Sequence, residues 1–209
     1  MPSRSRESAY DAMKSSILFA VLAWSTLQAP NLKDLEHELE APKPETRRAA
    51  VQKLAALGDR RAWELVLRAL GDSESMVADE AEVALGAITD PKLASELLGG
   101  AGLKSRDAWV RLRAAEAIGR MRIPFDGEVL ARALASSEPS EIELRRMLLW
   151  SIERLAVSKR VEGDRGKIFR AVEAIAASRA DPELRGAALE ATSALDTLEA
   201  HALVIQSLS

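Results

Sequence analysis

The chain has 209 residues, and its 29 basic and 32 acidic side chains leave a net charge of −3. Proteins that bind duplex nucleic acid normally carry a basic footprint, so this balance disfavours nucleic acid as a partner. The chain has no cysteine and only two histidines, His37 and His201. This composition excludes disulfides and thiolate metal sites and disfavours a histidine-dependent enzyme, so we expect neither a cofactor nor a metal.

The N-terminal part contains an uncharged apolar run over residues 17–27. The run is too short to span a bilayer, which needs about 20 residues, but it matches the apolar region of a secretory signal. We expect residues 1–30 to form a signal-like or anchor segment outside the working domain; the alternative is an amphipathic helix that caps the fold. The signal interpretation predicts export to the periplasm or the cell exterior, and the alternative predicts a cytoplasmic protein. Membrane contact is expected only through this segment, if it stays uncleaved.

From Pro30 onward, helical patterns alternate with turns. Asn31 is predicted to cap a short helix over 32–40, which the prolines of the segment 41–44 end. The next helix begins at Pro44, carries an apolar stripe at helical spacing and ends at Gly58. Its partner is predicted over 60–70, with Trp63 on the apolar face.

Four further helix pairs follow the same order. They are predicted over 75–88 with 92–98, 107–121 with 126–136, 140–157 with 165–178, and 181–195 with 197–208. The segment Gly99–Gly102 is expected to be a loose turn between repeats and a hinge. It is not expected to bind phosphate, because it lacks the Gly-Lys-Ser/Thr ending of a phosphate-binding loop. Strands are not expected, since no sustained alternation of apolar and polar residues occurs.

One sequence pattern occurs five times along the chain. ETRRAAVQKLAALG at 45–58 returns in related form at 76–89, 109–122, 143–156 and 183–196. Repetition at such a period is typical of a solenoid, in which each unit buries its apolar face against its neighbours. We expect a repeat domain over 31–209, with repeats at about 42–73, 74–102, 105–137, 139–178 and 180–208.

The first copy carries a family resemblance. Its residues Pro44–Arg47, Ala49–Ala50 and Ala56–Ala62 resemble the bacterial HEAT-like repeat, including the variety found in phycobilisome lyases. The resemblance implies an all-α fold, an α-α superhelix of about five helix pairs. It is weakly specific for function, because repeats of this family serve in scaffolds, adaptors, lyase-chaperones and some DNA glycosylases.

An arginine recurs in the first helical turn of four copies, and the second copy has Ala78 in its place. The four are Arg47, Arg111, Arg145 and Arg185. They could form an anion-binding ladder, or each could reach a carboxylate or a helix-end carbonyl in the neighbouring turn, with Asp59, Asp72 or Asp90 as acceptor. We favour the structural role, because a helix start repels cations that lack a partner.

The family resemblance implies that the second helix of each pair lies in the inner, concave row. Two of these helices carry a glutamate and an arginine four residues apart, Glu64 with Arg68 and Glu128 with Arg132. Such a pair indicates either an ordinary solvated helix face or a mixed-charge surface that binds a partner. Trp63 and Trp150 are expected in the core. Trp109 stands where other copies have Glu45 and Glu183, so it is expected to be exposed. No carboxylate is expected to have a raised pKa, since none stands in an apolar run. The candidate binding residues are therefore Glu64, Arg68, Ser95, Glu96, Trp109, Glu128, Arg132, Arg170 and Glu173.

These patterns predict a non-enzymatic scaffold that binds a protein or peptide through its concave face. An alternative from the resemblance is an accessory subunit of a lyase or chromophore-processing enzyme, which requires a deep pocket with clustered aromatic and acidic groups. A nucleic-acid-processing protein, like the HEAT-like alkylpurine glycosylases, would require a positive concave stripe.

Overall fold

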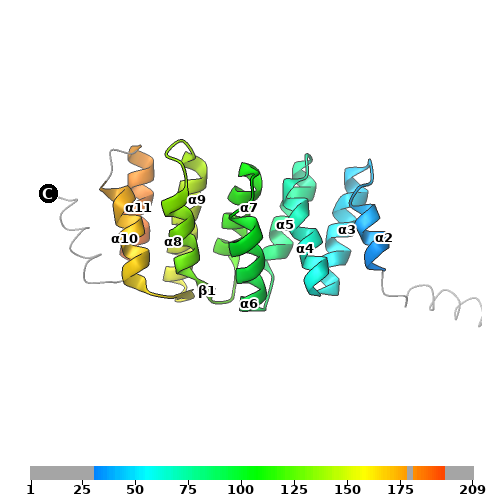
Figure 1. Cartoon of the computed structure of the whole chain (residues 1–209), viewed down its shortest axis with the longest axis horizontal. Coiled ribbons are helices and arrows are strands. Elements are labelled where there is room, and N and C mark those ends of the chain that lie inside the picture. Colours follow the sequence, from blue (N-terminus) through cyan, green and yellow to red (C-terminus); the bar gives the residue numbers. More distant parts are fainter. Residues whose placement is uncertain (1–30, 178–180, 196–209) are drawn as a thin grey trace, which may run out of the picture.

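A computed structural model describes residues 31–177 and 181–195, which form a row of helix pairs in chain order (Figure 1). This arrangement confirms the all-α solenoid. The first helices of the pairs, called the A row, are α3 (Pro44–Leu57), α5 (Ser75–Gly86), α7 (Ala108–Arg120), α9 (Ile142–Val157) and α11 (Pro182–Leu195). The B row begins with α2 (Leu32–Glu38), which precedes the first pair. The second helices of the pairs continue it: α4 (Arg60–Arg68) with the 3₁₀ turn η1 (Ala69–Gly71), α6 (Pro91–Ala94) with the π-helical η2 (Ser95–Gly102), α8 (Gly127–Ser136) and α10 (Arg165–Ala176).

Some sequence-based expectations lie outside the described residues. They are the signal-like segment at 1–30, the end of the helix predicted over 165–178 and the final helix predicted over 197–208. Within 31–177 and 181–195, no helix is both long and apolar enough to cross a membrane.

The helix ends follow from local capping residues, of which the sequence predicted Asn31 and Gly58. The Asn31 side chain accepts a hydrogen bond from the Lys33 amide at 3.1 Å and starts α2, and Asp59 does the same for Ala62 at 2.8 Å in α4. Such side-chain oxygens satisfy amides that have no partner inside the helix. Gly58 ends α3 with a φ of +70°, a left-handed conformation that glycine adopts without steric cost.

The segment from Gly99 to Gly102 is helical, so the prediction of a loose turn was wrong. A Cβ atom on Gly99 would lie 2.7 Å from Cγ1 of Val129, and one on Gly102 would lie 2.8 Å from Cβ of Ala114. These glycines therefore let η2 pack closely against α8 and α7. Close packing of backbone, rather than a turn, explains the glycine content of this segment.

Two short strands, which the sequence did not predict, join the starts of two B-row helices. β1 (Phe125–Asp126) and β2 (Val161–Glu162) pair in parallel just before α8 and α10. The Phe125 amide donates to the Arg160 carbonyl at 3.0 Å, and the Arg160 side chain donates to the Met121 carbonyl at 2.9 Å. Strands of two residues are too short to show an alternating pattern, which is why sequence analysis missed them.

Candidate functional site

Two of the recurring arginines make the structural contact that the sequence favoured. Arg47 donates to both carboxylate oxygens of Asp72 at 2.7 Å and to the Ala41 carbonyl at 2.9 Å. Its guanidinium holds the pKa of the Asp72 carboxyl below its ordinary value. Arg111 pairs with Glu141 and donates to the Ser105 carbonyl at 2.8 Å. Both arginines thus tie a helix start to the preceding turn and to the next repeat.

The contact does not recur in the other copies. Nε of Arg145 is buried without a hydrogen-bond partner. Arg185 is exposed and forms no ion pair within the described part of the chain. Ala78, which replaces the arginine in α5, is buried with 1% exposure. The four arginines therefore do not make the same contact in every repeat.

The predicted B-row residues are largely engaged with other B-row charges. Arg60 joins Glu64 and Glu96 at 3.3 and 2.6 Å, and Arg68 donates to Glu36 at 3.1 Å. The Arg60–Glu64 pair lies within α4, whereas the Arg60–Glu96 and Arg68–Glu36 pairs link α4 to η2 and to α2. They correspond to the solvated face that the sequence left open as the simpler interpretation.

The predicted pair on α8 is joined to the next B-row helix. Glu128 accepts from the Asp164 amide and from Lys167, each at 3.2 Å, and these contacts lower the pKa of its carboxyl. Arg132 lies 3.7 Å from Glu128 and lines, with Ser95, a hollow of about 370 Å³ between η2 and α8.

Two predicted residues on α10 remain apart from these pairs. Arg170 is exposed and Glu173 half-buried, and neither forms an ion pair with another described residue. The binding role of the B row, and its assignment as the concave face, stay predictions.

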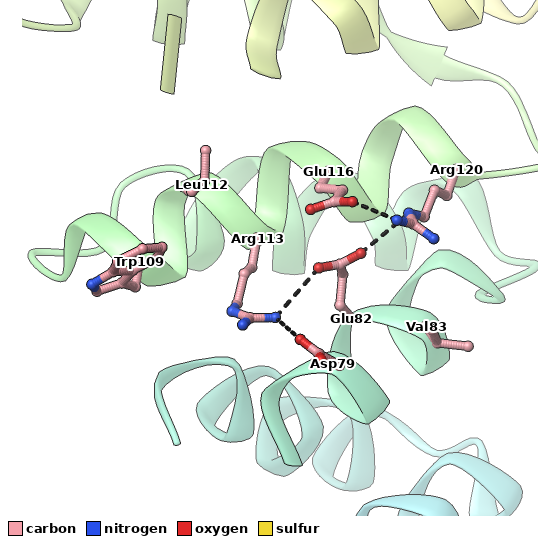
Figure 2. A pocket seen from close by; sticks show the side chains of 8 residues that line it. All are labelled: Asp79, Glu82, Val83, Trp109, Leu112, Arg113, Glu116 and Arg120. Carbon is pink, nitrogen blue, oxygen red and sulfur yellow. Dashed lines mark hydrogen bonds and ion pairs between the residues drawn. The ribbon is translucent and has the colours of Figure 1, made fainter. Parts of the chain in front are cut away.

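Trp109 lies on the A row, away from the other predicted binding residues. It is 67% exposed, as the sequence predicted, and it lines a hollow of about 430 Å³ with Val83, which is 58% exposed (Figure 2). On another side, Trp109 lines a hollow of about 310 Å³ together with Asp72 and Asp107. A large apolar side chain thus stands exposed between two depressions of the surface.

A charged network closes the base of the Trp109 hollow. Glu82 of α5 is only 5% exposed and lies 3.5 Å from Arg113 and 3.2 Å from Arg120, both on α7 (Figure 2). Arg113 also contacts Asp79 at 2.5 Å, and Arg120 contacts Glu116 at 2.5 Å. Burial, aided by the nearby charge of Glu116, raises the pKa of the Glu82 carboxyl to about 7.

The expectation that no carboxylate has a raised pKa was therefore wrong. The repeat itself carried a signal that could have found this residue. Aligned over the five copies, Glu82 stands where the others have Val51, Ala115, Leu149 and Leu189. The first three of these are fully buried. A carboxylate at a position that is apolar in the other copies is therefore the sequence signal that identifies Glu82.

A further hollow of about 270 Å³ lies across α7, α9 and α11 and shares Glu116 with the Trp109 hollow. Trp150 lines it and is half-buried, so its expected place in the core was wrong; Trp63 is in the core, as predicted. We call the two hollows together the A-row groove. It is lined by Asp79, Glu82, Val83, Trp109, Leu112, Arg113, Glu116, Arg120, Glu143, Arg146, Met147, Trp150, Glu153, Ala187 and Glu190.

The A-row groove has the chemistry of a binding surface. Its side chains offer apolar contact area and charged groups, and within the described ranges no cluster of acidic and histidine side chains is arranged to hold a metal ion. Glu82 itself is covered and held by two guanidiniums, so its carboxylate is not presented to a molecule in the hollow.

Residues 32–119 match the family model of HEAT repeats. Comparison with curated proteins gives no match. Among solved structures, the chain is similar to an engineered protein with 18% identity, a TM-score of 0.46 and coverage of 83% of each chain. A second engineered protein shows 16% identity and a TM-score of 0.47, over 85% of this chain and 87% of that one. A designed armadillo repeat protein shows 15% identity and a TM-score of 0.47, over 85% and 88%.

Proposed function

We propose that the chain, whose residues 32–119 match the family model of HEAT repeats, is a non-enzymatic scaffold that binds a protein or peptide segment in the A-row groove. One observation carries the proposal: Trp109 and Val83 are both exposed and line the same hollow of about 430 Å³, lying toward opposite ends of it (Figure 2). Large apolar side chains beside a depression are typical anchors of protein interfaces, and tryptophan is enriched among the residues that dominate binding energy.

The exposed apolar side chains support the A row over the B row. Ion pairs line both surfaces, such as Arg60 with Glu96 in the B row and Arg113 with Asp79 in the A-row groove, so the charges alone do not distinguish them. In the A-row groove the exposed apolar groups have no such contacts to lose. Covering Trp109 would remove apolar surface from water, which favours association.

The test compares partner capture by three variants of the full chain from the native extract. Trp109→Ala is expected to reduce recovery of a specific partner by about tenfold or more, in line with the loss of an interface anchor. Glu64→Gln, an exposed B-row change, is expected to leave capture intact. Arg111→Ala is the stability control: it is expected to lower the melting temperature without affecting capture, because Arg111 ties repeats together and does not line the groove.

Retention of the partner by Trp109→Ala, with loss in Glu64→Gln, would move the binding surface to the B row. Loss in all three variants in proportion to their melting temperatures would mean that capture reports folding only. The accessory role in a lyase and the nucleic-acid role stay predictions, which turnover of a chromophore substrate or retention on a duplex column would support instead.

A further inference from the structure

We propose that the segment bound in the A-row groove is cationic, with lysine or arginine side chains seated beside Trp150 at the α7–α9–α11 hollow. The inference rests on the proposed function and specifies the chemistry of the partner. It is carried by the distribution of charge in the groove, by two carboxylates without ion pairs among the described residues and by Trp150, which lines the same hollow.

The groove is acidic, and most strongly so at its C-terminal end. Four carboxylates and the guanidinium of Arg146 line the α7–α9–α11 hollow, and one of the four, that of Glu116, is paired with Arg120. Arg146 is already shared between Glu143 and Glu183, at 3.4 and 3.5 Å. The hollow therefore carries a net negative charge that the described part of the chain does not neutralise, and a cationic partner is the complement to such a surface.

Two of these carboxylates are free to pair with a partner. Glu153 is half-buried on α9 and Glu190 is exposed on α11, and neither forms an ion pair with another described residue. A lysine or arginine placed between them would gain two charged contacts without displacing an existing one. This distinguishes them from the B-row carboxylates, which are largely paired.

Trp150 supplies apolar surface to the hollow, and a cation of the chain itself lies over its ring. The guanidinium carbon of Arg154 already lies 5.8 Å from its ring centroid, within the range of a cation–π contact. Gly119 makes room for this ring, because a Cβ atom there would lie 2.4 Å from Cζ3 of Trp150. Trp150 thus packs against α7 and also lines the hollow.

The test uses the full chain and two fluorescein-labelled peptides, one of alternating lysine and glycine and one of alternating glutamate and glycine, with anisotropy at low ionic strength. The lysine peptide is expected to bind and the glutamate peptide to fail. The double variant Glu153→Gln/Glu190→Gln is expected to lower the affinity for the lysine peptide by about five- to tenfold, since two exposed charge pairs are removed. Because these residues have no ion pair to lose, the fold is expected to be unaffected, which a thermal melt checks.

The matched control is Glu64→Gln/Glu173→Gln, which removes the same charge from the B row and is expected to change the affinity by less than about twofold. Equal losses in both double variants would show attraction to overall charge only and would overturn the proposal, as would preference for the glutamate peptide. Self-association of the chain that the A-row variant abolishes would mark the surface as a contact between copies and would also overturn it.

Failure of this inference can be told apart from failure of the proposed function. A captured protein that Trp109→Ala loses, but whose bound segment is neutral or acidic, would leave the scaffold role intact and exclude the cationic segment. Loss of the lysine peptide in the A-row variant alone supports the inference directly.

Discussion

Glu82 combines a core position of the repeat with a charge, and its neighbours decide its ionisation. Arg113 and Arg120 lie within 3.5 Å and favour the carboxylate, whereas burial and Glu116 favour the neutral acid. The outcome is a pKa of about 7, well above the ordinary value of 4.5. The two guanidiniums thus reduce the cost of burying this carboxyl group without removing it.

This balance predicts a stability that falls as the pH rises from about 5 to 8. Between the ordinary pKa and the raised one, the folded chain holds a proton that the unfolded chain has released, so the free energy of unfolding decreases through this range. The decrease is on the order of 2–3 kcal/mol for a shift of this size. Thermal melts at pH 5 and pH 8 should show it in the native chain, and Glu82→Gln should abolish most of it.

The chosen range avoids the carboxylates whose pKa is lowered. Asp72 and Glu141 lose their stabilising contacts only as the pH falls below the ordinary range, so they contribute little between pH 5 and 8. Glu64→Gln is the control for removal of an exposed carboxylate. An unchanged pH dependence in Glu82→Gln would contradict the assignment.

Two adjacent glycines of η2 allow a matched test of how helices pack. A Cβ atom on Gly99 would meet the side chain of Val129 on α8 at 2.7 Å, whereas one on Gly100 would find nothing within 4 Å. Gly99→Ala is expected to lower the free energy of unfolding by about 1–3 kcal/mol through overpacking. Gly100→Ala is expected to be neutral or to stabilise by up to about 1 kcal/mol, since alanine restricts the unfolded chain.

Denaturant unfolding of the two variants measures the difference. Equal effects at both positions would mean that η2 and α8 can separate without cost. A stabilising Gly99→Ala would show that helix propensity outweighs the contact with Val129, and the glycine would then have no packing role.

Helix boundaries could be predicted because they depend on neighbouring residues. Asn31, Asp59 and Gly58 act within three residues of their own positions, and a single sequence contains that information. The glycines at 99 and 102 act through α8 and α7, which lie farther along the chain. Their composition resembles that of a turn, and only the contacts between repeats show that they belong to a helix.

The candidate site was only partly predictable for the same reason. Trp109 could be identified because its equivalents Glu45 and Glu183 are exposed. The burial of Glu82 depends on packing against α7, and the position of Trp150 depends on the space that Gly119 of α7 leaves for its ring. Alignment of the five copies indicates that Glu82 occupies a core position, whereas the residues around Trp150 in the sequence do not indicate where its ring lies.

The whole molecule is held together by packing between neighbouring repeats. The A row is continuous from α3 to α11, and the junction of α7 with α9 is especially close. There the buried Ser151 hydroxyl lies 2.7 Å from the Ala115 carbonyl, and Gly119 accepts the ring of Trp150. In such a fold, stability is approximately a sum of the stabilities of the repeats and of the interfaces between them.

Weakening this one junction should therefore destabilise the molecule locally. Gly119→Ala forces the new methyl group against Trp150 and Ser151, at 2.4 and 2.8 Å. Hydrogen exchange measured by mass spectrometry should show lost protection in α7, α9 and α11, while α3 stays protected, because α3 packs chiefly against its own neighbours. Gly186→Ala, with open space around the added methyl group, is the control and should leave protection unchanged. Equal loss of protection in every helix would show that the repeats unfold as one unit, and the interfaces would then be too strong for any single repeat to open alone.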